Sequence, residues 1–337
     1  MSRTDIRTTL ENRVFYFIPS IIVLTVWAIY VTLADQIHLL AQHWELMLTM
    51  VFGSLVAGAT SEGGGAVAFP VFTKVLDVPP AVARTFALAI QMVGMGTASI
   101  VIFKYRIPVV RRALILSSLG GFVGVVFGLI YVAPALPPAY FKIAFTIITL
   151  AFGFVLFMEN RDMRFKRFDD ITYSSRAGGV LLVAMGLFGG VFTSIVGTGI
   201  DFLTFAVLVL YFNVSEKVAT PTSVVLMAVC STAGIFTQHF VMDGFRGAAF
   251  DYWIACIPIV IFGAPIGALI CAKVSRENIT RFLLFLIGTE FVSTILLVKF
   301  TVFSALFAVG LFIVLIAVFV LLNRLRLKKL EGLAART

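Results

Sequence analysis

The sequence predicts an all-α integral membrane protein, and three observations lead to this fold class. Of the 337 residues, 60% are hydrophobic and only 13% are charged, and the mean hydropathy is +1.06. A soluble domain is about 45–50% apolar and about 25% charged, so this chain has too much apolar surface to keep from water. Apolar runs of about 20 residues, the length of a transmembrane helix, follow one another nearly end to end. The third observation is that Lys and Arg gather in the short loops between these runs.

The net charge of +9 is therefore a topology signal. Basic loops mark the cytoplasmic side of a membrane protein, so we exclude nucleic-acid binding and expect the lipid bilayer as the partner. Three Arg residues precede the first apolar run, 14–33, and a cluster of four basic residues, Arg324, Arg326, Lys328 and Lys329, comes directly after the last one, 301–322. We therefore expect a multi-pass protein of the bacterial inner membrane, with a retained first helix and both termini in the cytoplasm.

Glycine-rich segments interrupt two of the apolar regions. Residues 59–66 read ATSEGGGA, and residues 193–201 read TSIVGTGID. Each glycine disfavours a helix by about 1 kcal/mol relative to Ala, so we predict a helix break at both places. The expected uninterrupted helical runs are 79–103, 109–132 and 139–158 after the first break, then 217–240, 252–272, 279–298 and 301–322 after the second.

The two halves of the chain have the same order of elements, which predicts an internal duplication. Aligning Asp77 with Asn213 also aligns Gly63 with Gly199. The expected segments are an N-terminal tail, first helix and outer loop (1–45), repeat 1 (46–158), a basic cytoplasmic linker (159–177), repeat 2 (178–298), and a last helix with a basic tail (299–337).

The positive-inside rule then decides how the interrupted regions cross the membrane. If the first crossed fully, Lys104, Arg106 and their basic neighbours would lie outside. If it is a re-entrant hairpin that returns to the side it entered, these residues lie inside, as the rule requires. The sequence therefore predicts about eight spanning helices and two re-entrant helical hairpins. Each repeat is a hairpin plus three helices, and the two repeats are inverted. Ten plain helices are the alternative.

Candidate ligand-binding residues gather at the two breaks. Non-helical backbone is tolerated in the membrane only inside protein or beside water, and helix N-termini attract anions. Tight helix packing is the alternative role for the glycines, and N-capping is the alternative for the polar side chains. The candidate substrate-binding residues are Ser61, Glu62, Gly63, Gly64, Gly65, Thr198, Gly199 and Asp201.

Glu62 presents an electrostatic conflict. An ionised carboxylate about 4 Å from a bound anion repels it by about 4 kcal/mol at an effective dielectric of about 20. Glu62 either points away and caps its half-helix, or takes up a proton when the anion binds. We predict the second role, which makes the proton a candidate coupling ion.

Arg84 and Gln91 complete the candidate site. They share one face of the helix that follows the first break, seven residues apart. Arg84 holds or guides an anion, or else extends to the outer membrane surface, and the sequence leaves both roles open. We find no catalytic motif, no metal-ligand spacing and no cofactor signature, so we expect a protein that is not an enzyme. The cysteines Cys230, Cys256 and Cys271 are interpreted as packing residues.

The first break and the segment after it resemble the TauE/SafE sulfite exporter family. The resemblance rests on GATSEGGG at 58–65, on Phe69-Pro70 and on VPPAVA at 78–83. In the second half, Gly197-Thr198-Gly199 and the pair Thr222-Ser223 follow the family pattern. The resemblance therefore adds Thr222 and Ser223 to the substrate-binding candidates. The chain departs from the pattern at Phe86-Ala87, where the first half would carry Thr-Ser, and at Ile200-Asp201.

The resemblance implies a secondary transporter, either an exporter or a permease, working by alternating access. Its substrate would be a small sulfur-containing anion such as sulfite, sulfoacetate or another organosulfonate. The residues alone suggest a small anion without identifying sulfur. A membrane-embedded enzyme and a non-transporting subunit of a membrane complex are the alternatives. The oligomeric state stays open, a homodimer included.

Overall fold

The all-α prediction is confirmed by the computed structural model, which describes residues 17–61, 63–160, 167–171, 176–298 and 300–334. These residues contain thirteen α-helices and no β-strand. Three short segments are π-helical or 3₁₀-helical: η2 (Val71–Val75), η3 (Gly128–Val132) and η4 (Ala133–Ala135). The α-helices are α2 (Ile18–Leu33), α3 (His38–Gln42), α4 (Trp44–Ala59), α5 (Gly65–Pro70), α6 (Pro80–Lys104), α7 (Arg111–Phe127), α8 (Pro138–Asn160), α9 (Arg176–Val196), α10 (Ile200–Leu210), α11 (Glu216–Phe240), α12 (Ala248–Lys273), α13 (Arg276–Leu297) and α14 (Val302–Ala334).

Within the described ranges, seven helices are long and apolar enough to cross a membrane: α6, α7 with η3 and η4, α9, α11, α12, α13 and α14. This set confirms a multi-pass membrane protein but differs from the eight spanning helices expected. Helix α2, with 16 residues, falls below the spanning length, whereas α8 has 23 residues and keeps its expected spanning role as a prediction. Helix α9 was expected to be one arm of the second interrupted region, but with 21 residues it is long enough to span the membrane.

Both predicted helix breaks are present. Helix α4 ends at Ala59 and α5 begins at Gly65, while α9 ends at Val196 and α10 begins at Ile200. The second break is shorter than expected, because residues 193–196 remain helical. Each break contains left-handed glycine backbone, which other L-residues rarely adopt: φ is +67° at Gly63, +86° at Gly197 and +151° at Gly199.

The backbone turns that follow the two breaks are alike. The N–H of Val78 donates to Phe72 O at 2.8 Å, and the N–H of Val214 donates to Leu208 O at 2.9 Å. The residues before these donors, Asp77 and Asn213, have φ of 52° and 58°. The helices that start next, α6 and α11, both have 25 residues. These equivalent pairs follow one constant sequence offset, the one predicted by aligning Asp77 with Asn213.

The two halves exchange helix contacts. Helix α4 packs on α12, α9 packs on α7, and α6 and α11 pack on each other. Glycines let these backbones approach closely: a Cβ at Gly58 would meet Ala264 O, and a Cβ at Gly120 would meet Val183 O. Each half therefore buries its first broken helix against a helix of the other half.

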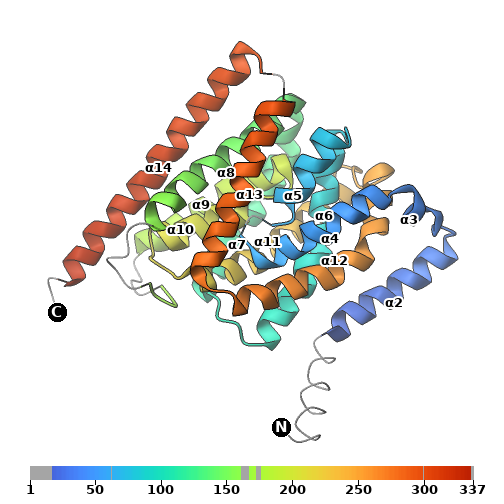
Figure 1. Cartoon of the computed structure of the whole chain (residues 1–337), viewed down its shortest axis with the longest axis horizontal. Helices are drawn as coiled ribbons and strands as arrows, with labels where there is room; N and C mark the ends of the chain where they lie inside the picture. The colour runs from blue at the N-terminus through green and yellow to red at the C-terminus, as the bar shows by residue number, and fades with distance from the viewer. Residues whose placement is uncertain (1–16, 62, 161–166, 172–175, 299, 335–337) are drawn as a thin grey trace, which may run out of the picture.

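The first and last long helices lie on the flanks of this core. Figure 1 shows α14 along one side of the bundle beside α8, and α2 on the other side beside α12. The part of the basic linker that the structure describes, 167–171, is held against the end of α10. There, Arg167 donates to Asn213 Oδ1 and to Val209 O, each at 2.9 Å. The domain boundaries given above stay predictions.

Candidate functional site

The two breaks meet inside the bundle. A Cβ placed on Gly63 would lie 2.7 Å from Asp201 Oδ2 and 2.9 Å from Gln91 Oε1. Gly63 belongs to the first break, Asp201 to the first turn of α10 after the second, and Gln91 to the middle of α6. The structure thus brings together three residues that the sequence analysis selected from three separate elements. Asp201 is fully buried and Gln91 is 3% exposed.

Asp201 closes the N-terminus of its own half-helix. Its Oδ1 accepts from Gly199 N at 2.8 Å and Phe202 N at 3.1 Å, and its Oδ2 accepts from the Thr198 hydroxyl at 2.7 Å. The next N–H, that of Ile200, donates to Thr193 Oγ1 at 3.0 Å. The N–H groups at the start of α10 are therefore occupied by protein oxygens. These bonds match the capping role, the alternative left open for the polar residues at the breaks, and substrate binding by Thr198, Gly199 and Asp201 stays a prediction.

Gln91 ties α6 to the second break. Its amide NH₂ donates to Ala87 O at 3.0 Å and to Gly197 O at 2.7 Å. Its carbonyl oxygen is buried and has no hydrogen-bond partner among the described residues, and the same holds for the hydroxyl of Ser61 in the first break. Buried polar atoms without partners are rare, so these two oxygens point to a ligand or to water.

Arg84 is a buried cation at the same interface. Only 8% of the residue is exposed, its Nε has no hydrogen-bond partner, and it forms no ion pair within the described part of the chain. A Cβ placed on Gly197 would lie 3.1 Å from Arg84 O, so this turn of α6 packs on the second break. The burial disagrees with a guanidinium that extends to the outer membrane surface, which was one of the two roles left open.

The other candidates are placed less centrally. Thr222 Oγ1 accepts from Val110 N at 3.0 Å and donates to Val218 O, and the Ser223 hydroxyl donates to Thr220 O at 2.8 Å. Both hydroxyls therefore have local backbone partners.

The remaining glycines belong to the first break. Gly64 packs against α4, where a Cβ on it would lie 3.3 Å from Gly53 O and 3.4 Å from Ala57 Cβ. Gly65 is the first residue of α5. Glu62 lies outside the described residues, so its proton role stays a prediction.

A buried ion pair beside the first break was not among the residues predicted from the sequence. Lys74 Nζ in η2 lies 2.7 Å from Glu290 Oε1 in α13, and both side chains are almost fully buried. Lys74 also donates to Ser293 Oγ at 3.0 Å and to Thr294 Oγ1 at 2.7 Å, while Thr146 of α8 donates to Glu290 Oε1 at 2.8 Å. We call this set the Lys74 cluster. Intramembrane charges are functional candidates by default, so the lone acid of the apolar run in α13 was the available signal.

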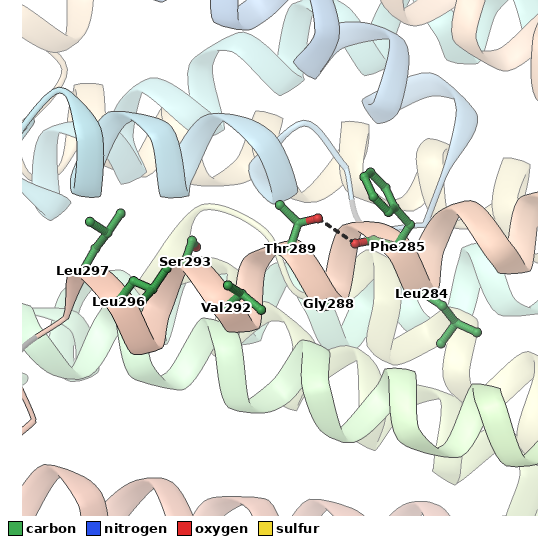
Figure 2. A pocket seen from close by; sticks show the side chains of 8 residues that line it. All are labelled: Leu284, Phe285, Gly288, Thr289, Val292, Ser293, Leu296 and Leu297. Carbon is green, nitrogen blue, oxygen red and sulfur yellow. Dashed lines mark hydrogen bonds between the residues drawn. The ribbon is translucent and has the colours of Figure 1, made fainter.

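A surface groove lies outside the breaks. It has a volume of about 620 Å³ on the surface of α13 and is lined mostly by apolar side chains. Figure 2 shows Leu284 and Phe285 on opposite sides of this helix, and Thr289 donates to Phe285 O at 2.9 Å. Because its lining is apolar and open, we assign this groove to lipid. A smaller pocket of about 260 Å³ is lined by Lys74 and Glu290.

The helices and the interrupted core define a multi-pass membrane protein whose polar residues converge inside the bundle. Residues 46–294 match the family described as sulfite exporter TauE/SafE. The match covers most of the chain, so the protein belongs to this family of membrane transporters. It begins in α4 and ends in α13, which leaves α2 and α14 outside it. Comparisons with curated proteins and with solved structures found no match.

Proposed function

We propose that the protein is a secondary transporter of a small sulfur oxyanion, such as sulfite or an organosulfonate like sulfoacetate. The single observation that supports an anionic substrate is the burial of the Arg84 side chain. Arg84 has no ion-pair partner among the described residues. A buried charge without such a partner costs several kcal/mol, and we propose that an anionic substrate offsets this cost. The planar guanidinium matches the paired oxygens of a sulfite or sulfonate group by two parallel hydrogen bonds. Sulfur as the central atom rests on membership of the family.

Alternating access is the proposed mechanism, with two inverted repeats and two re-entrant hairpins. Three observations support it: the equivalent turns after the two breaks, the meeting of the breaks at Gly63 and Asp201, and the exchanged packing of α4 and α9. In transporters of this type, substrate sites lie near the membrane midplane between repeats and are built by discontinuous helices. Rocking of the two halves around this point would expose the site to each side in turn.

The proposed location is the bacterial inner membrane with both termini in the cytoplasm, as the basic loops indicate. The electrical potential, inside negative, then favours outward movement of an anion by about 2.3 kcal/mol per unit charge per 100 mV. Export of the anion needs no coupling ion, whereas uptake against the same potential does. The protein is proposed to have no catalytic role.

The test is anion flux in proteoliposomes with a panel of sulfite, sulfoacetate, sulfate and chloride. We expect flux of at least one sulfur anion by the wild type. Arg84→Gln should reduce it at least tenfold, and Arg84→Lys should retain part of it, because Lys keeps the charge but not the fork of donors. Arg111→Gln is the matched control, since Arg111 is exposed at the start of α7.

Two outcomes would contradict the proposal. Full flux by Arg84→Gln would remove Arg84 from the anion site. Absence of flux for every anion by a correctly inserted wild type would favour a membrane-embedded enzyme or a non-transporting subunit instead.

A further inference from the structure

Two oxygen acceptors converge on one small space over Gly63. Asp201 Oδ2 and Gln91 Oε1 lie 2.7 and 2.9 Å from the point where a Cβ of residue 63 would stand, and Met95 Cε lies 3.1 Å from it. The backbone at Gly63 is left-handed, which keeps this space free of a side chain. A Cβ at this point would be in close contact with Met95 Cε and both oxygens, so a group as large as a sulfonate does not fit between these atoms.

The orientation of the Gln91 amide follows from its hydrogen bonds. Its NH₂ group is held by two carbonyl oxygens, those of Ala87 and Gly197. Rotating the amide by half a turn would place its oxygen against these two oxygens and lose both bonds, so Oε1 must face the space over Gly63. This oxygen has no hydrogen-bond partner in the part of the chain that the structure describes.

Asp201 presents negative charge to the same space. Its two oxygens accept three hydrogen bonds from neutral donors, and no cation pairs with it in the described part of the chain. An anion placed here would face a carboxylate and an amide oxygen and be repelled by both. A small cation would satisfy both acceptors.

We propose that Asp201 and Gln91, over Gly63, bind the coupling cation of the transporter, which is Na⁺ or a proton. Both are hard cations that oxygen ligands suit, and interrupted membrane helices hold such ions in other transporters. The coupling role of this cation rests on the proposed transport function. The cation site itself is inferred from the positions of the two oxygens, independently of transport. It assigns the anion to Arg84 and the cation to Gln91, two turns further along the same face of α6, about 10 Å away.

Binding at this point would draw the two breaks together. Gly63 comes from the first break, Asp201 from the second, and Gln91 bonds to Gly197 within the second. A cation held between them therefore links both interrupted segments to α6, the helix that carries Arg84. This link is the physical means by which cation binding would favour one arrangement of the anion site.

The first measurement needs no anion. The unfolding temperature of the purified full-length protein is followed in detergent while NaCl replaces choline chloride at constant ionic strength, and separately across pH 5–8 without Na⁺. A ligand that binds only the folded state raises this temperature. We expect the wild type to respond to Na⁺ or to protons, and the arm that responds identifies the cation. Asp201→Asn should lose that response, while Asp243→Asn, at an exposed site, should keep it.

The second measurement is anion flux under an imposed Na⁺ gradient and under an imposed pH gradient. The gradient that matches the first measurement should stimulate wild-type flux at least tenfold and leave Asp201→Asn flux unchanged. Gln91→Leu, which keeps the bulk but removes the oxygen, should raise the half-saturating cation concentration at least tenfold. Glu62→Gln should keep the response if Asp201 is the cation ligand.

The outcomes separate the two proposals. Cation-dependent stabilisation without any flux would sustain the cation site and overturn the transport proposal. If the wild type transports the anion but responds to neither Na⁺ nor protons in both measurements, the cation site is overturned. This outcome depends only on the wild type, so it holds whether or not Asp201→Asn folds. The cation site at Asp201 would also be overturned if Glu62→Gln lost the cation response while Asp201→Asn kept it. Glu62 would then be the cation ligand.

Discussion

Gly63 combines a left-handed backbone with a position beside the two oxygens of the proposed cation site. Its φ of +67° costs any L-residue about 1–2 kcal/mol, and a methyl group would contact Asp201 Oδ2 at 2.7 Å. We therefore expect Gly63→Ala to insert, to unfold at a lower temperature, and to transport at least tenfold more slowly. Flux in proteoliposomes and thermal unfolding in detergent check both parts.

Gly96→Ala is the matched control for this substitution. Gly96 lies in α6, and nothing lies within 4 Å of a Cβ placed there. Alanine favours a helix by about 1 kcal/mol over glycine, so this variant should be at least as stable as the wild type and equally active. Normal transport by Gly63→Ala would show that the space over Gly63 holds no ligand.

The candidate residues could be selected from the sequence, but not their roles. Polar residues are rare in apolar runs, so Arg84, Gln91 and Asp201 stood out from their surroundings alone. Whether a carboxylate caps a helix or binds a ligand depends on its rotamer, which the sequence does not contain. Asp201 turned out to occupy the N–H groups that were expected to attract the anion.

At the scale of elements, the short arms after the two breaks end alike. Lys142 Nζ donates to the carbonyl oxygen of Thr73, and Arg167 donates to that of Val209, which is the equivalent position in the second half. A cation at the C-terminal end of a helix offsets its dipole. The two cations come from different elements, since Lys142 lies in α8 and Arg167 in the linker before α9.

The Lys74 cluster ties η2 to α13, and its energy can be measured by a double-mutant cycle. Removing one partner of a buried pair leaves an uncompensated charge, so Lys74→Met or Glu290→Gln should each lower the free energy of unfolding by about 3–5 kcal/mol. The double variant Lys74→Met/Glu290→Gln should lose much less than the sum of the two single losses. Equilibrium unfolding in mixed micelles gives the three values.

An exposed ion pair in the same chain serves as the control. Asp243 and Arg246 are 2.6 Å apart, with side chains that are 60% and 72% exposed. Solvent screening reduces such a pair to about 0–1 kcal/mol, so Arg246→Ala should change stability little. Additive losses for Lys74 and Glu290 would mean that the two charges do not stabilise each other.

The Lys74 cluster shows where sequence reasoning ends at this scale. Lys74 and Glu290 are 216 positions apart, and helix periodicity predicts which residues share a face of one helix but not which helices meet. The interruptions themselves were predictable, because consecutive glycines and left-handed turns are local properties.

For the molecule as a whole, the proposal that the first hairpin is re-entrant makes a sharp prediction about sidedness. In a variant whose three buried cysteines are replaced by alanine, Tyr105→Cys should react with a membrane-impermeant maleimide only from the cytoplasm. Ala135→Cys should react only from outside. Both positions are exposed, and they lie at opposite ends of the α7 segment.

A hairpin that crossed the membrane fully would reverse both results. Tyr105 would then be labelled from outside and Ala135 from the cytoplasm. Protease accessibility of the 161–166 loop in inverted vesicles is an independent check, because this basic loop should be cytoplasmic in the re-entrant arrangement.

The order and lengths of the elements followed largely from hydropathy and glycine content. The expected runs 79–103 and 217–240 became α6 and α11 within one residue at each end. The set of spanning helices did not follow, because length and composition do not say whether α9 crosses the membrane or turns back within it.

The exchanged packing of α4 on α12 has a consequence for how the chain is made. About 190 residues separate these helices, and at about 5–20 residues per second a ribosome needs about 10–40 s to synthesise them. During that time the glycine-lined face of α4 has left the translocon without its native neighbour. Lipid chains, a chaperone or a temporary non-native helix must cover it until α12 arrives, so assembly of the core is completed only late in synthesis.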